Sequence, residues 1–269
     1  MRALCVLRAA PVYRRDAVFQ GLRAAGYEVH TKMMPHLCAS DIIVTWNRYG
    51  VPDQQAHIIE RAGGRAVIME NGYLGKDLAG DSWYALSIGH HAGRGTWPGS
   101  GGPAAHWGMA EGGGACDRWD DLGIQLAPWR EPGGETIVLH QRGIGEHGIA
   151  SPHRWAEDLT PRIKGARMRA HPGAGNTTDL EHDVRRASEV ITWASGAALR
   201  CLTMGIPVWY AMPGWIGAPA SLPLQDRARG WLALRNDAAR LGMLRRLAWA
   251  QWRLSEIESG HAFRTILGV

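Results

Sequence analysis

Four short segments of the sequence place chemically active side chains directly after apolar runs. A carboxylate in such a position can accept a proton from a hydroxyl group, and a guanidinium can hold a phosphate group through two hydrogen bonds. A serine followed by glycine can begin a helix whose unbonded backbone N–H groups attract an anion. Together the residue types favour a site for a phosphate-bearing ligand and a hydroxyl group. The segments are Glu70-Asn71-Gly72-Tyr73-Leu74, Gln141-Arg142-Gly143, His171-Pro172-Gly173 and Ser195-Gly196-Ala197.

Each segment also has a structural interpretation. Ser195 can be an ordinary helix N-cap, and Arg142 can be a solvated loop residue. Glu70 can be an exposed glutamate in a turn. His171 can be hydrogen bonded at a strand edge, where Pro172 would end the strand. The order of the four segments along the chain therefore carries the functional prediction, rather than any segment alone.

The segments follow strands of a predicted α/β fold. Apolar runs rich in Val and Ile alternate with helical patterns, which is typical of parallel β-α-β units. Since ligands bind beyond the carboxyl ends of the strands in such sheets, the four segments are expected to meet at one site. The predicted strands are 3–7, 27–31, 41–46, 65–70, 135–140, 166–171, 189–194 and 206–210, and the predicted helices are 15–25, 52–62, 152–164, 179–187 and 195–204.

A change of composition near the middle of the chain predicts two domains. Residues 89–134 are dense in glycine and have no periodic pattern, so we expect ordered loops and an interdomain connection there. Residues 237–259 are predicted to form one or two helices. We therefore predict two Rossmann-like α/β domains facing across a cleft, residues 1–130 and 131–269, with the C-terminal helices packing back.

Composition narrows the class of protein. The chain has 269 residues, of which 45% are hydrophobic, and a net charge of +5. No apolar run approaches the roughly 20 residues that span a membrane, and a signal peptide is lacking, so a soluble cytoplasmic protein is expected. The positive charge fits an anionic partner. The four cysteines lack the spacing of a zinc site, and the first predicted strand lacks the glycine fingerprint that binds NAD.

The order of the motifs resembles a known family. Residues 65–208 are similar to capsule polysaccharide glycosyltransferases of the Kdo-transferase type. The motifs that carry the similarity are, in chain order, E-N-G-Y-L, a strand that ends in glutamine, the pair His171-Pro172, and S-G-A-A-L-R-C-L-T-M-G-I-P-V-W. That family has two Rossmann-like domains in the GT-B arrangement. The resemblance implies that the His-Pro pair contacts the nucleotide phosphate and sugar, and that an acid of the first motif is the base. The sequence departs from the family at Asn71, where the family has aspartate, and at Arg200, where it has the glutamate that binds the ribose.

The resemblance and the residues together predict a metal-independent GT-B glycosyltransferase with a nucleotide-sugar donor. A UDP-sugar is the favoured donor and a CMP-sugar the alternative, with no permanently bound cofactor. Glu70 is the predicted general base of an acceptor domain. The predicted donor-binding residues are Gln141, Arg142, Gly143, His171, Pro172, Gly173, Ser195, Gly196 and Ala197, and the predicted acceptor-side residues are Asn71, Tyr73, His90, His91 and Arg94.

The acceptor is predicted from charge and from a second resemblance. The segments H-H-A-G-R-G-T-W-P and L-A-W-A-Q-W-R-L-S-E-I-E-S-G-H-A-F resemble proteins from phages of GC-rich bacteria. With the positive charge and the interleaved tryptophans, this favours a hydroxymethylated pyrimidine in phage DNA, and hence DNA as a partner. Alternative predictions are a polysaccharide acceptor, a sugar-nucleotide epimerase and a non-enzymatic nucleic-acid-binding protein.

Overall fold

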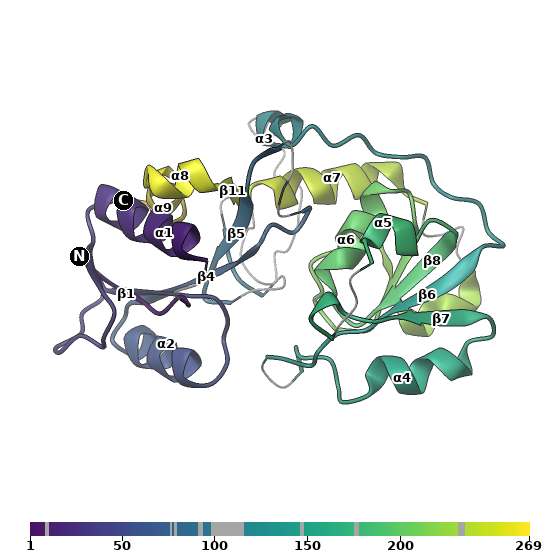
Figure 1. Ribbon diagram of the computed structural model, residues 1–269, viewed down its shortest axis with the longest axis horizontal. Helices are drawn as coiled ribbons and strands as arrows, with labels where there is room; N and C mark the ends of the chain where they lie inside the picture. The colour runs from purple at the N-terminus through teal and green to yellow at the C-terminus, as the bar shows by residue number, and fades with distance from the viewer. Residues whose placement is uncertain are drawn as a thin grey trace. The chain divides into compact units, whose positions relative to one another are not determined.

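The chain forms two compact units (Figure 1). The computed structural model describes residues 1–8, 11–75, 77, 80–90, 94–97, 116–145, 148–174, 178–230 and 235–269. Unit 1 consists of Met1–Leu122 and Arg246–Val269, and unit 2 of Gly123–Arg245. The predicted boundary follows residue 130, and Arg246–Val269, which was placed in the predicted second domain with its helices packing back, is part of unit 1.

In its described residues, unit 1 contains a six-stranded mixed sheet with the order β11-β5-β4-β3-β1-β2. The strands β1, β2, β3 and β4 are parallel, whereas β5 is antiparallel to both β4 and β11. The strand order reverses between β1 and β3, so unit 1 has a topological switch point there. The strands are β1 (Arg2–Cys5), β2 (Glu28–His30), β3 (Ile42–Thr45), β4 (Arg65–Asn71), β5 (Trp83–Ile88) and β11 (Gln251–Arg253).

Helices cover both faces of this sheet. Helix α1 (Val12–Ala24) buries Val18 and Leu22, one helical turn apart, in the same core as α8 (Leu254–Glu258) and α9 (His261–Leu267). Helix α2 (Val51–Arg61) buries Ile59 against the opposite face, where it packs over β3 and β4 (Figure 1). A short helix, α3 (Cys116–Asp121), precedes the end of the first segment of unit 1. The two helical layers leave the sheet edges as the places where a ligand can reach the strands.

In its described residues, unit 2 contains a five-stranded parallel sheet with the order β10-β9-β8-β6-β7. The strands are β6 (Glu135–Leu139), β7 (Ala166–Arg169), β8 (Ala187–Thr192), β9 (Val208–Tyr210) and β10 (Leu222–Pro223). The helices are α4 (Trp155–Leu159), α5 (Leu180–Asp183), α6 (Gly196–Thr203) and α7 (Asp237–Ala248), and the chain returns to unit 1 within α7. The order reverses between β6 and β8, which is the switch point of a doubly wound sheet.

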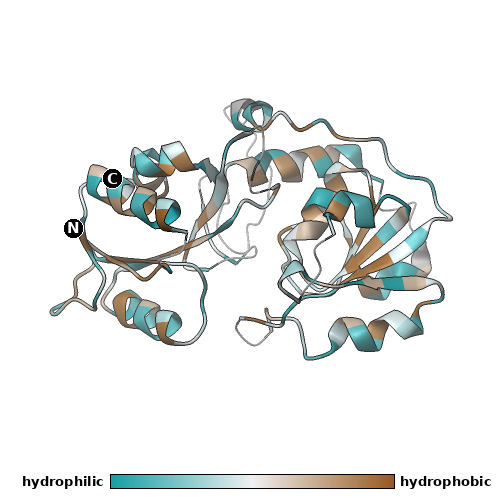
Figure 2. Ribbon diagram, viewed as in Figure 1, coloured by the Kyte–Doolittle hydropathy of each residue, from teal (hydrophilic) through white to brown (hydrophobic). Residues whose placement is uncertain are grey.

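These sheets confirm the predicted α/β class, but three strands were not predicted. The strands β5 and β10 were absent from the prediction, and β11 lies where a helix was expected. Trp252 is fully buried in β11, at a position that the helical pattern also favoured as apolar. In Figure 2 the central strands of unit 1 are brown, whereas its helices alternate brown and teal along their length. No helix in the described ranges is long and apolar enough to cross a membrane.

Candidate functional site

The switch point of unit 2 brings two of the predicted segments together. Gln141 follows β6, and the Ala194-Ser195 segment follows β8. The side-chain Oε1 of Gln141 accepts a hydrogen bond from the backbone N–H of Ala194 at 2.7 Å. This bond ties the carboxyl ends of two neighbouring strands at the point where the strand order reverses. In doubly wound sheets that crevice is where ligands bind.

The segment after β8 begins helix α6. Ser195 is its N-cap, because its Oγ accepts a hydrogen bond from the N–H of Ala197 at 3.2 Å. The N–H of Ser195 itself donates to Thr192 Oγ1 at 2.8 Å. A Cβ at Gly196 would have nothing within 4 Å, so neighbouring atoms do not require glycine there. The first turn of α6 therefore lies open at the strand edge, with the partial positive charge of a helix start.

Arg142 and His171 lie close together across the ends of β6 and β7. A Cβ built on Gly173 would lie 3.1 Å from Arg142 Nη1 and 3.1 Å from His171 Nδ1. The N–H of Gly173 donates to His171 Nδ1 at 2.8 Å, so Nδ1 is an acceptor and the neutral ring carries its proton on Nε2. Burial lowers the pKa of His171, and the charges of Arg142, His140 and Arg169 lower it further. His171 is thus a neutral ring with an N–H donor at Nε2.

The remaining predicted donor residues shape the backbone around this edge. Gly143 has a φ of +64°, in the left-handed region, and a Cβ there would lie 2.9 Å from the carbonyl oxygen of Ser151. Glycine at 143 is therefore required by the fold itself. Pro172 begins the short 3₁₀ helix η3 (Pro172–Ala174), which turns the chain directly behind His171.

In unit 1, Glu70 and Tyr73 form a pair. The hydroxyl of Tyr73 donates to Glu70 Oε2 at 2.9 Å. The next residue, Leu74, donates its backbone N–H to Gln251 Oε1 at 2.6 Å, so strand β11 holds the loop that follows β4. Side chains alternate along a strand, so Glu70 shares the α2 face of the sheet with Ile68, whereas Asn71 is directed to the α1 face. The two neighbouring polar side chains of this motif therefore do not share one face.

The structure does not bring His90 and Arg94 to Glu70. Strand β5 runs antiparallel to β4, and Ile88 pairs with Val67. The N–H of Gly89 then donates to the carbonyl oxygen of Ala66, at the start of β4. Glu70 lies four positions further along the strand than Ala66, or about 13 Å. His90 and Arg94, expected beside Glu70 on the acceptor side, thus follow the opposite end of β4, because β5 was not predicted. His91 lies outside the described residues.

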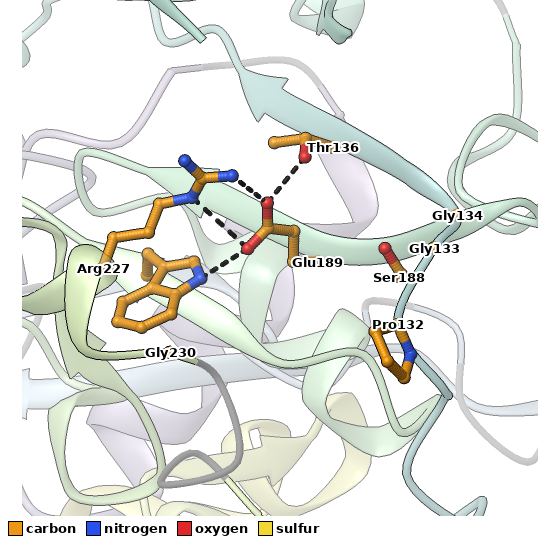
Figure 3. Close-up of a pocket in the computed structure, with 9 residues that line it drawn as sticks. Pro132, Gly133, Gly134, Thr136, Ser188, Glu189, Arg227 and Gly230 are labelled. Atoms are coloured by element: carbon orange, nitrogen blue, oxygen red, sulfur yellow. Dashed lines mark hydrogen bonds and ion pairs between the residues drawn. The ribbon is translucent and has the colours of Figure 1, made fainter. Parts of the chain in front are cut away.

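Sequence reasoning missed a polar network at the other edge of the unit 2 sheet (Figure 3). Glu189 accepts hydrogen bonds from Thr136 Oγ1 at 2.6 Å and Trp209 Nε1 at 2.7 Å, and it forms an ion pair with Arg227 of the 3₁₀ helix η5 (Leu224–Arg229). Burial alone would raise the pKa of Glu189, but the hydrogen bonds from Arg227, Thr136 and Trp209 outweigh it and hold the pKa below its usual value.

This network lines a pocket of about 300 Å³. The residues that line it are Pro132, Gly133, Gly134, Thr136, Ser188, Glu189, Trp209, Arg227 and Gly230. Both oxygens of Glu189 are already hydrogen bonded, so the carboxylate is a structural group and is not poised to take a proton. No local pattern in the sequence indicates it, since its partners come from three separate segments. Within the described part of the chain, no group of three or more His, Cys, Asp or Glu side chains could hold a metal ion.

The comparisons with known proteins identify the fold. No family model and no curated protein sequence matches the chain. In fold it is similar to Thermosulfurimonas dismutans KpsC, beta Kdo 2,7 transferase, with a TM-score of 0.59 and 11% identity over 98% of this chain and 99% of that chain. It is also similar to the beta Kdo 2,4 transferase of KpsC from the same organism, with a TM-score of 0.57 and 13% identity over 93% and 90%. The two α/β units are therefore arranged along the chain as in these transferase structures.

Proposed function

We propose that this protein is a glycosyltransferase that moves a sugar from a nucleotide-sugar donor to a hydroxyl acceptor. The observation that carries the proposal is that Gln141 and Ser195 lie at the switch point of unit 2, with Arg142 and His171 close together at the ends of β6 and β7 beside it. The fold, shared with two Kdo transferase structures, supports it. In the GT-B arrangement that we propose, unit 2 binds the donor and unit 1 binds the acceptor.

The proposed donor site neutralises phosphate charge. The exposed guanidinium of Arg142 can bind phosphate oxygens through two hydrogen bonds, and the partial positive charge at the start of helix α6 attracts the same anion. The Nε2–H of His171 donates to a phosphate oxygen or to a sugar hydroxyl without adding a charge. When the bond to the sugar breaks, negative charge grows on the leaving phosphate, and these donors stabilise it. The proposal assigns this role to protein groups and none to a metal ion.

The proposed acceptor base is Glu70, the carboxylate at the end of β4. Asn71 cannot take a proton at neutral pH, so the carboxylate of this motif is Glu70 alone. The Tyr73 hydroxyl holds one of its oxygens in place, and we assign to this carboxylate the role of accepting the proton of the attacking hydroxyl group. The expected consequence is that Glu70→Gln retains donor binding and loses transfer.

Of the two predicted acceptors, a saccharide and a hydroxymethylated pyrimidine in DNA, we propose the saccharide. A DNA strand is bound through many phosphate contacts, and each needs a basic side chain. In unit 1, Arg48 is instead bound to Asp53, Glu60 and the carbonyl oxygen of Gly89, and Arg15 lies beside Asp16. The hydroxymethylated pyrimidine therefore remains the second candidate, tested by the loss of affinity for modified duplex DNA as salt rises.

Thermal shift with a panel of UDP- and CMP-sugars tests the donor site. A ligand present at about a hundred times its Kd adds about 2.7 kcal/mol to the free energy of unfolding, which is easily measured. Arg142→Ala is expected to abolish the shift. Arg162→Ala is the matched control, because it removes an exposed arginine just before β7, at the opposite edge of the same sheet. If no nucleotide sugar shifts the wild-type protein, the proposed function is overturned.

A further inference from the structure

Another cavity of unit 2 lies at the amino ends of its strands, outside the groups used above. Its volume is about 260 Å³. Residues near the starts of β6 and β7, the end of α5 and the turn between α5 and β8 surround it (Figure 1). The proposed donor residues follow the carboxyl ends of the same strands, so the cavity belongs to the opposite edge of the sheet. The residues that line it are Glu135, Arg167, His182, Asp183, Arg185 and Arg186.

Two consecutive arginines of the turn, Arg185 and Arg186, line the cavity, and both are exposed. We call them the arginine pair. Arg185 Nη1 donates to His182 Nε2 at 2.6 Å, which holds one side of the guanidinium and leaves its remaining N–H groups for another acceptor. In the described part of the chain, neither arginine forms an ion pair, and the Arg186 side chain makes no hydrogen bond. The arginine pair is therefore open to a ligand that enters the cavity.

The carboxylates that line the cavity are bound to other arginines. Glu135 Oε2 lies 3.2 Å from Arg167 Nη2. Asp183 Oδ2 lies 2.8 Å from Nε of the buried Arg169. Each carboxylate is thus matched by one guanidinium, and the two charges of the arginine pair remain. Like charges that face one cavity repel each other, and an anion in the cavity removes that repulsion.

Hydrogen-bond donors cover the backbone carbonyl groups of the turn, whose partial negative charges would otherwise oppose an anion. The carbonyl oxygen of Asp183 accepts from Arg167 Nη2 at 2.7 Å. The carbonyl oxygen of Arg186 accepts from the N–H of Glu135 at 2.9 Å. Arg130 Nη1 donates to three more, the carbonyl oxygens of Val184, Arg185 and Ala187, at 2.6, 3.1 and 3.0 Å. The arginine side chains therefore dominate the potential in the cavity.

The charge and the shape of the cavity favour one phosphate group. A phosphate monoester carries roughly 1.5 to 2 negative charges at neutral pH, close to the charge of the arginine pair. Guanidinium groups bind phosphate oxygens through paired hydrogen bonds. A nucleic-acid strand instead needs a row of cations along its phosphates. The exposed carboxylate of Glu181, which pairs with Arg200 on α6, interrupts such a row on the helix beside the cavity.

We propose that the arginine pair and Arg167 form a binding site for the phosphate monoester group of a small soluble molecule. Arg185 and Arg186 bind the phosphate oxygens, and Arg167 adds a third guanidinium that Glu135 holds in place. Because arginine can only donate, His182 Nε2 is an acceptor, and the ring offers its Nδ1–H as a neutral donor. The inference goes beyond the proposed function and does not depend on it, since it uses the opposite edge of the sheet.

Phosphorus NMR titration of the full chain tests the site with four probes: glucose 6-phosphate, inorganic phosphate, a single-stranded thymidine oligonucleotide and vesicles that contain phosphatidic acid. The first two are expected to bind, and Arg186→Gln is expected to weaken that binding about tenfold, the loss typical of one charge-assisted hydrogen bond. Arg186→Glu, which reverses the charge at the same exposed position, is expected to weaken it further. Arg23→Gln is the matched control, because it removes an exposed arginine from α1 in unit 1.

Repetition of the titration in Arg142→Ala separates the two edges of the unit 2 sheet. Phosphate binding that survives Arg142→Ala and is weakened by Arg186→Gln supports the inference. If Arg142→Ala abolishes all phosphate binding, or if Arg186→Gln and Arg23→Gln behave alike, the inference is overturned. Binding of the oligonucleotide alone, or of the vesicles alone, also overturns it and assigns the arginines to that partner.

Thermal shift with nucleotide sugars keeps this inference distinct from the proposed function. If nucleotide sugars raise the melting temperature and Arg186→Gln leaves phosphate binding unchanged, this site is refuted while the proposed function stands. If Arg186→Gln weakens phosphate binding and no nucleotide sugar shifts the melting temperature, the site stands and the transferase proposal fails.

Discussion

Replacement of Gln141 separates the structural and binding roles of the unit 2 switch point. Gln141→Leu removes the acceptor of the 2.7 Å hydrogen bond and leaves the half-buried N–H of Ala194 without its partner. The expected cost is about 1–2 kcal/mol of unfolding free energy. The melting temperature of unit 2 is then expected to fall by roughly 3 °C or more for each kcal/mol lost. Gln141→Glu keeps an oxygen acceptor at this place, so its stability is expected to stay near that of the wild type.

The two variants differ in their effect on an anionic ligand. The carboxylate of Gln141→Glu introduces a negative charge beside the start of α6, where the proposed phosphate binds. At a separation of about 6 Å and an effective dielectric constant of about 20, Coulomb's law gives a repulsion of about 3 kcal/mol. That repulsion corresponds to roughly hundredfold weaker binding of a nucleotide sugar. Gln141→Glu is therefore expected to fold normally and to bind donor poorly.

Urea unfolding and calorimetric titration with a nucleotide sugar measure the two effects separately. Gln125→Glu is the control for charge, because Gln125 is exposed and the neighbouring Ala127 bonds to Thr203 at the far end of α6. This control is expected to bind donor as the wild type does. If Gln141→Glu also binds donor as tightly as the wild type, no phosphate lies at this strand edge. If Gln141→Leu is as stable as the wild type, the link between β6 and β8 contributes nothing.

Two further predictions concern stability. Gly21→Ala is expected to destabilise unit 1, because a Cβ at position 21 would clash with the carbonyl oxygen of Ile257. The cost of this clash is expected to exceed the roughly 1 kcal/mol by which alanine is more favourable than glycine in a helix. Circular dichroism melting checks this, and an increased melting temperature would contradict it. The pKa of Glu189 is lower in the folded protein than the pKa of an unfolded glutamate, which is near 4.3. Its contribution to the free energy of unfolding is therefore fully present above about pH 4.3, and it is lost as the pH falls through the pKa of the folded state. Urea unfolding between pH 3 and pH 7 is expected to show a weaker pH dependence in Glu189→Gln than in the wild type, and equal slopes would refute the assignment.

The local pattern of the sequence predicted much of unit 2. The segments after β6, β7 and β8 were each recognised as strand ends, and Gln141, Arg142, His171 and Ser195 lie at one edge of the sheet as expected. All three strands are parallel; the chain passes through α4 between β6 and β7, and through η3 and α5 between β7 and β8. In such a topology the carboxyl ends meet at one edge, so the order of elements along the chain is sufficient to predict their meeting.

Pairing between distant segments decided the rest. The direction of β5 depends on its contact with β4 and with β11, which comes from the far end of the chain, and neither partner is visible in the local pattern of residues 83–88. This direction separates His90 and Arg94 from Glu70. Periodicity predicts many of the helices and strands, but it indicates a helix where β11 lies, and the hydrogen-bond partner of an added strand is chosen by packing. The sequence by itself thus determined the alternating elements and the chemistry at their ends, whereas only the tertiary structure decided which ends lie together in unit 1.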